Sequence, residues 1–227
     1  MRRLVGFLIL SLIATCSLTA SVFTLGSLQD ANIANGSNLD SNFGGLSEFL
    51  INWGCGGAPG CVEPTSSLGL IQFDLSGLAG STVTNATLML FHEANSAAGR
   101  SFSLFRNTSA WGESTVTFAT APTFDPLAVS TLAIDGADFN SGLYRSFDLT
   151  GMVQGWINGT PNFGLTLMEL PDQPAWAYFS SKEASPGQIP QLVITTSDIG
   201  TVPEPGTIAL LGAGLALLAG VARRRRS

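Results

Sequence analysis

The sequence predicts an all-β fold, because short runs of aromatic, β-branched and threonine residues alternate with clusters of Gly, Pro, Asn, Asp and Ser. About ten such runs at close spacing are typical of an antiparallel sandwich or barrel. Only residues 149–158 have helical periodicity, with Thr150 as the expected cap, and residues 30–45 are expected to form a long loop. The predicted strands cover residues 68–74, 83–93, 101–106, 115–118, 130–134, 143–149, 163–169, 175–180 and 192–196.

The last residues of the chain form a three-part tail. A Pro-Glu-Pro triplet precedes an uncharged stretch, 207–222, which as a helix would be roughly 24 Å long against a hydrocarbon core of about 30 Å. Arginine side chains can reach the interface and favour the cytoplasmic side, so a transmembrane helix with its end inside is expected. A buried core helix is the alternative, and four glycines disfavour it. The triplet is Pro203, Glu204 and Pro205, and the basic end is Arg223, Arg224, Arg225 and Arg226.

This tail, residues 201–227, resembles the PEP-CTERM sorting signal of Gram-negative bacteria that make exopolysaccharide. The resemblance implies that an exosortase, a membrane transpeptidase, recognises the triplet while the helix and the arginines hold the chain. It also implies export, a transient stay in the inner membrane, and delivery to the cell surface or the extracellular matrix.

The first twenty residues have the layout of a secretory signal peptide. Arg2 and Arg3 precede an apolar run, 4–14, and small or polar residues follow at 16–21. A signal-peptide helix over residues 1–20, cleaved near 19–21, is therefore expected. Lipidation at Cys16 is an alternative, which the threonine before the cysteine disfavours.

The charge of the mature chain restricts its partners. Residues 21–202 contain fifteen acidic and four basic residues, a net charge of about −11. No Lys/Arg cluster is present to displace counterions from DNA or RNA, so nucleic acid is not an expected partner. A strongly anionic polymer would need a local basic patch or a bridging metal ion.

Two cysteines remain after signal removal, Cys55 and Cys61, and the glycine- and proline-rich residues between them can turn back on themselves. An exported chain favours a disulfide between them, which would contribute roughly 2 kcal/mol. A zinc site is the alternative, but it needs further ligands, and His92 is the sole histidine.

A second resemblance covers most of the mature chain. Residues 42–51, 69–75 and 83–88 look like the opening of a DNRLRE domain, and residues 111–122 look like its middle block. Residues 147–159 and 179–193 resemble its closing blocks. This family is related to carbohydrate-binding module family 96, so the resemblance implies one jelly-roll β-sandwich domain, residues 21–200, and binding of extracellular polysaccharide.

Aromatic rings stack on the apolar faces of sugars, which makes tryptophans the first candidates for glycan contact. Trp111 and Trp156 are expected to anchor a loop and the helix to the core. The candidate carbohydrate-binding residues are Trp53, Trp176, Tyr178 and Lys182. A structural Ca²⁺ bound by oxygen ligands is also considered, and Asp30, Asp40 and Glu183 could supply them.

The sequence favours a non-enzymatic protein. His92 lies within a predicted strand, without the context of a Ser-His-Asp or Cys-His site, and no catalytic residue is proposed. The expected role is weak glycan binding or a structural role in exopolysaccharide. The alternatives are a polysaccharide lyase or hydrolase, which would need two carboxylates at a defined separation, and a surface protein without a ligand.

Overall fold

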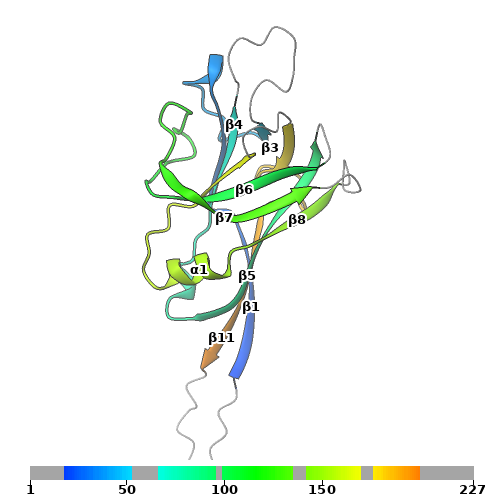
Figure 1. Cartoon of the computed structure of the whole chain (residues 1–227). Coiled ribbons are helices and arrows are strands. Elements are labelled where there is room, and N and C mark those ends of the chain that lie inside the picture. Colours follow the sequence, from blue (N-terminus) through cyan, green and yellow to red (C-terminus); the bar gives the residue numbers. More distant parts are fainter. Residues whose placement is uncertain (1–17, 53–65, 96–98, 135–141, 170–175, 200–227) are drawn as a thin grey trace, which may run out of the picture. The chain divides into compact units, whose positions relative to one another are not determined.

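The computed structural model describes residues 18–52, 66–95, 99–134, 142–169 and 176–199, which form an all-β fold (Figure 1). These residues include one α-helix, α1 (Thr150–Ile157), and two short 3₁₀-helices, η1 (Gly36–Asn38) and η2 (Ser76–Leu78). The strands are β1 (Leu18–Gly26), β2 (Gln29–Ala34), β3 (Glu48–Asn52), β4 (Ser67–Gln72), β5 (Thr82–Asn95), β6 (Arg100–Asn107), β7 (Phe124–Ile134), β8 (Leu143–Asp148), β9 (Leu165–Glu169), β10 (Trp176–Ser180) and β11 (Gln191–Ile199).

The strands join in one curled sheet of order β1-β11-β5-β10-β3-β4-β9-β6-β7, with β2 pairing with β4 and β8 pairing with β5. The long strand β5 organises one side of this sheet. β11 and then β10 pair with one edge of β5, and β8 pairs antiparallel with the other edge. The pairs β2–β4, β4–β9, β9–β6 and β6–β7 continue the antiparallel arrangement on the other side.

The main core lies between these strands and α1. Inward positions alternate along the strands, as in Leu88 and Leu90 of β5, which are fully buried. Val153 and Trp156 of α1 are also buried there, with Met152 and Ile157 packed against the same cluster. The prediction that Trp156 anchors the helix is therefore confirmed.

A second, smaller core covers the opposite face of β2 and β4. Ala31, Ile33, Leu68, Leu70 and Val116 form it, and Trp111 packs against it from the segment between β6 and β7. Trp111 also donates a hydrogen bond from Nε1 to the carbonyl oxygen of Phe163 at 2.9 Å. As the sequence predicted, Trp111 anchors a loop.

Three local predictions are wrong. Residues 29–34 form β2 rather than a loop, because the Asn32 amide donates to the Leu50 and Leu68 carbonyls and so can be buried. Residues 115–118 form no strand, and the N-cap residue of α1 is Leu149, which makes no side-chain cap. The Thr150 hydroxyl instead accepts a hydrogen bond from the Ala86 backbone, and Asp148 accepts one from the Thr150 backbone.

Within the described residues, no helix combines the length and the apolar character that crossing a bilayer requires. The predicted signal-peptide and C-terminal helices lie outside those residues, as do Trp53, Cys55, Cys61, the Pro203 to Pro205 triplet and Arg223 to Arg226. Residues Ser21–Ser197 form one compact unit.

Candidate functional site

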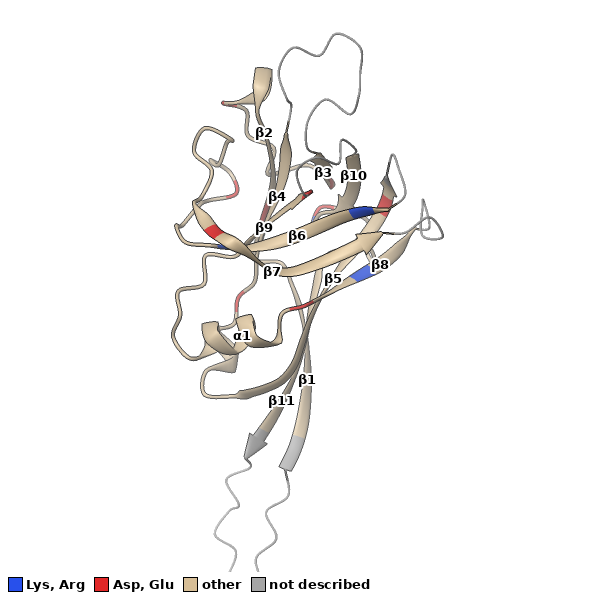
Figure 2. Cartoon of the chain, viewed as in Figure 1, with Lys and Arg blue, Asp and Glu red and all other residues tan. Residues whose placement is uncertain are grey.

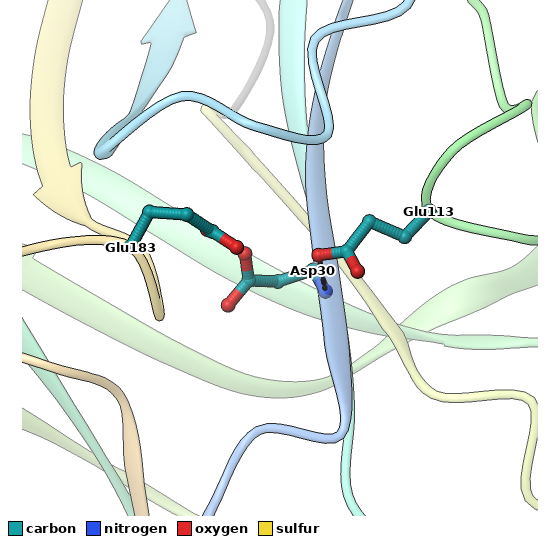
Figure 3. Close-up of side chains that lie close together, drawn as sticks. All are labelled: Asp30, Glu113 and Glu183. Atoms are coloured by element: carbon teal, nitrogen blue, oxygen red, sulfur yellow. Dashed lines mark hydrogen bonds between the residues drawn. The ribbon is translucent and has the colours of Figure 1, made fainter.

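Three acidic side chains from distant parts of the sequence converge beside β2. Asp30 lies on β2, Glu113 lies between β6 and β7, and Glu183 follows β10. One carboxylate oxygen of each lies within 4.8 Å of the others, and Figure 3 shows the Glu183 and Glu113 carboxylates directed toward Asp30 from opposite sides. We call these residues the carboxylate cluster. Of the residues considered as calcium ligands, Asp30 and Glu183 belong to it, whereas Asp40 is exposed in a turn after η1 and does not.

Asp30 occupies the buried centre of the cluster, with 1% of its surface exposed. Its Oδ2 accepts hydrogen bonds from the Ser27 hydroxyl at 2.8 Å and from the Lys182 backbone N–H at 3.0 Å. The Asp30 backbone N–H in turn donates to Glu113 Oε1 at 3.2 Å. The other oxygen of Asp30, Oδ1, is buried and has no hydrogen-bond partner among the described residues.

Glu113 is positioned by the segment 42–44. The Asn42 side-chain amide donates to the carbonyl oxygens of Glu113 and Val116, at 2.7 and 2.6 Å. Gly44 allows this approach, because a Cβ atom at that position would lie 2.2 Å from the Glu113 carbonyl oxygen. The Asn-Phe-Gly-Gly sequence therefore holds the backbone of Glu113 against this segment, which precedes β3.

Glu183 is positioned by the tight turn after β10. The Ser181 hydroxyl lies 2.6 Å from the Leu46 carbonyl oxygen and 3.0 Å from Glu183 Oε2. The intervening residue, Lys182, places its Nζ 2.8 Å from Glu113 Oε1 and 2.5 Å from Glu183 Oε1. Lys182 is therefore the cation of the carboxylate cluster.

Burial dominates the electrostatics of Asp30 and raises its pKa from 3.8 to about 7. The hydrogen bonds from Ser27 and Lys182 oppose this shift, and the negative charges of Glu183 and Glu113 add to it. The same two glutamates raise the pKa of Lys182, chiefly through hydrogen bonds to its ammonium group. Near neutral pH the cluster therefore contains a fixed cation and a carboxyl group close to its titration point.

The second candidate site is an aromatic pair on β10, formed by Trp176 and Tyr178. Strand alternation buries Ala177 and Phe179 in the main core and places the pair on the opposite face. The two rings have centroids 5.2 Å apart and are tilted by 60°. Trp176 is 38% exposed, so an apolar sugar face could reach its ring.

Tyr178 also lines a pocket of about 270 Å³, which we call the polar pocket. Its wall combines apolar side chains with hydrogen-bonding groups, an arrangement typical of ligand sites. Partial burial, and then the neighbouring charge of Glu93, raise the pKa of Glu48 in this wall. The other lining residues are Asn32, Ala34, Asn38, Phe43, Leu46, Leu50 and Ser67.

A larger pocket, of about 380 Å³, lies beside α1 and is partly lined by Gln72, Asn162 and Trp156. Two of its amides already serve the fold. Gln72 Nε2 donates to the Asn162 carbonyl at 2.8 Å, and Asn162 Nδ2 donates to the Phe73 carbonyl at 2.9 Å. This pocket therefore has fewer polar groups free to bind a ligand than its volume suggests.

The structure brings together some of the candidate binding residues and separates others. Trp176 and Tyr178 are neighbours, whereas Lys182 belongs to the carboxylate cluster and is not part of the wall of the polar pocket. His92 is a buried strand residue whose ring lies 5.3 Å from that of Phe179. As in the sequence, charged residues are sparse on the described strands and loops (Figure 2).

Sequence reasoning missed Glu113 and Glu48. Glu113 lies in the segment 111–118, which resembles a family block. Its position in that block was the one feature of the sequence that could have indicated a functional role. Glu48 gave no local signal, because its neighbours Asn32 and Tyr178 in the polar pocket come from two other strands.

An antiparallel β fold that presents an aromatic pair beside a polar pocket has the features of a sugar-binding module. The model of carbohydrate-binding module family 96 matches residues 21–196, and the chain belongs to this family. The PEP-CTERM protein-sorting motif matches residues 201–226. Both family resemblances predicted from the sequence are confirmed. No curated protein matches the chain.

Proposed function

We propose that this protein is an exported, non-enzymatic surface or matrix protein that binds a polysaccharide through the aromatic pair and the polar pocket. The observation that carries the proposal is the position of Tyr178, which belongs to both. A sugar ring on the pair would bring its hydroxyl groups toward Glu48 and Asn38. Carbohydrate recognition commonly combines such an apolar platform with hydrogen-bonding groups.

Family membership supports a glycan as the ligand, and the charge of the chain indicates which kind of glycan. Membership of a carbohydrate-binding module family suggests a glycan, and the acidic surface favours a neutral or weakly charged polymer. Because Lys182 is held by Glu113 and Glu183, it has little capacity to attract an anionic sugar. The proposed fold of the domain, residues 21–200, is a jelly-roll β-sandwich. A Cys55–Cys61 disulfide is proposed to close a small loop in the segment between β3 and β4.

A glycan array of bacterial exopolysaccharides tests this function on the full-length chain in mild detergent. Binding should fall about tenfold when Trp176 or Tyr178 is replaced by alanine, a loss of about 1.4 kcal/mol. Phe124→Ala is the matched control, because Phe124 is 37% exposed on β7, away from the polar pocket. The proposed function would be contradicted if the protein bound no glycan on the array, or if Phe124→Ala lost as much binding as the Trp176 and Tyr178 variants.

The proposed route to the surface uses both ends of the chain. A signal peptide over residues 1–20 directs export, and the family match begins at residue 21, next to the expected cleavage position. The C-terminal helix then stays in the inner membrane, with the arginines on the cytoplasmic side, until an exosortase cleaves the chain near Pro203 to Pro205. Mass spectrometry should find secreted protein without Arg223 to Arg226, and an intact tail in that material would refute this step.

A polysaccharide lyase or hydrolase is the competing function, and one observation favours it. Asp30 has a pKa near 7 beside two other carboxylates, which is typical of a general acid. Against this, Asp30 is almost completely buried, so a glycosidic bond cannot reach it in the described conformation. Release of reducing ends or unsaturated products from a polysaccharide panel, abolished in Asp30→Asn, would establish the enzyme instead.

A further inference from the structure

The carboxylate cluster holds more negative charge than Lys182 neutralises. The cluster holds three carboxylates, from Asp30, Glu113 and Glu183, and one ammonium group, which pairs with the two glutamates. Two negative charges remain when Asp30 is ionised. Asp30 is buried, and a buried charge is stable only if it is paired or bound to a metal ion, or if its group is protonated. A divalent cation would balance the remaining charge.

The geometry suits a single ion. Two oxygens bound to the same calcium at about 2.4 Å can be at most about 4.8 Å apart. The three carboxylate oxygens satisfy this limit, because all lie within 4.8 Å of one another. In Figure 3 the Asp30 carboxylate lies between the side chains of Glu113 and Glu183.

A second observation, independent of the clustering, points to a missing partner. Asp30 Oδ1 is buried without a hydrogen bond from any described residue, although its Oδ2 receives two. Leaving a buried acceptor without a partner destabilises the fold, because the oxygen loses its water without gaining another donor. A metal ion is a partner that an oxygen with free lone pairs can bind.

We propose that Asp30, Glu113 and Glu183 bind a calcium ion, and that Lys182 supplies the substitute cation when calcium is absent. Ligands that are all oxygen favour calcium over zinc or copper. The Lys182 side chain is 29% exposed on a flexible stem, so its ammonium group can move into solvent when the ion enters.

The ion would join three segments that the chain connects only through long intervening sequences. These are β2, the segment 108–123, and the turn after β10. The turn also contacts the Leu46 carbonyl through Ser181, and Leu46 lines the polar pocket. Calcium would therefore stabilise the wall of that pocket, although calcium binding itself does not depend on the proposed glycan function.

Isothermal titration with CaCl₂ tests the site on the full-length chain in mild detergent, after treatment with EDTA. One ion should bind with a Kd of about 10⁻⁴–10⁻³ M, the range of extracellular modules, and MgCl₂ should bind more weakly. Asp30→Asn and Glu183→Gln should each weaken calcium binding at least tenfold. Asp40→Asn removes an exposed acid outside the cluster and should bind calcium as the wild type does.

Lys182→Gln separates a metal site from a purely structural ion-pair network. Removing the competing ammonium should tighten calcium binding by about tenfold, because ligand charge tunes calcium affinity. A structural network predicts no such gain, only a less stable protein.

Two results would overturn the proposal. One is the absence of binding heat and of any thermal shift up to about 10 mM CaCl₂ in folded wild-type protein, well above the expected Kd. The other is a Lys182→Gln variant that stays folded by circular dichroism and binds calcium no more tightly than the wild type. No glycan is present in these measurements, so their failure leaves the proposed function untouched.

Discussion

The carboxylate cluster draws its residues from three distant segments, whereas the aromatic pair comes from alternate positions of one strand. The cluster is buried around Asp30 and depends on hydrogen bonds from Ser27 and the Lys182 backbone. The aromatic pair needs only the alternation of β10 to face outward. A change in the cluster should therefore alter the stability of the fold, and a change in the pair should alter binding alone.

The largest expected effect concerns the pH dependence of stability without calcium. The folded pKa of Asp30, about 7, is raised above its unfolded value, 3.8, so the folded protein binds the proton more tightly. The contribution of Asp30 to stability should be greatest below pH 4, fall as the pH rises to 7, and stay low above it, a difference on the order of 4 kcal/mol. Urea denaturation in EDTA should show this decline in Asp40→Asn but not in Asp30→Asn. Equal slopes in the two variants would contradict this assignment.

Gly44→Ala should destabilise the protein by about 3 kcal/mol. The new Cβ would lie 2.2 Å from the Glu113 carbonyl oxygen, so backbone must move on one side. Gly45→Ala is the matched control, because nothing lies within 4 Å of a Cβ atom there. Chemical denaturation of the two variants measures the difference, and similar midpoints would show that Gly44 is not a packing constraint.

Tyr178→Leu tests the aromatic pair without emptying its position. We expect glycan affinity to fall about fivefold to tenfold while the free energy of unfolding changes by less than about 0.5 kcal/mol. A parallel loss of stability in thermal denaturation would mean that Tyr178 supports the fold rather than the ligand.

The smallest effect is expected at Glu48. As a carboxylate it can accept a hydrogen bond from a sugar hydroxyl, and its raised pKa means that this form is lost earlier on acidification. Glycan binding by the wild type should weaken about threefold as the pH falls through that pKa, whereas Glu48→Gln should bind independently of pH. Binding assays from pH 4 to 8 distinguish these curves, and identical curves would remove Glu48 from the site.

The strands of the main core could be predicted from the sequence because their patterns are local. The alternation in residues 175–180 predicts β10 and the outward position of Tyr178. Residues 29–34 were missed because Asp30 and Asn32 are polar, and only distant partners make their burial possible. Residues 115–118 have strand-forming composition, but Asn42 binds the Val116 carbonyl and the segment turns. Glu113 was missed because the residues around its side chain in the folded protein come from distant parts of the sequence.

The shared edge of β5 has a mechanical consequence. β11, the strand nearest the sorting motif, pairs with β5 from Gln191↔Met89 onward, and β10 pairs with the same edge from Phe179↔His92. If the tail is tethered while a polymer is held at Trp176, tension enters through β11, passes along β5 and leaves through β10. Such a load would be carried lengthwise by rungs of hydrogen bonds acting together, so the sheet would resist pulling along β5.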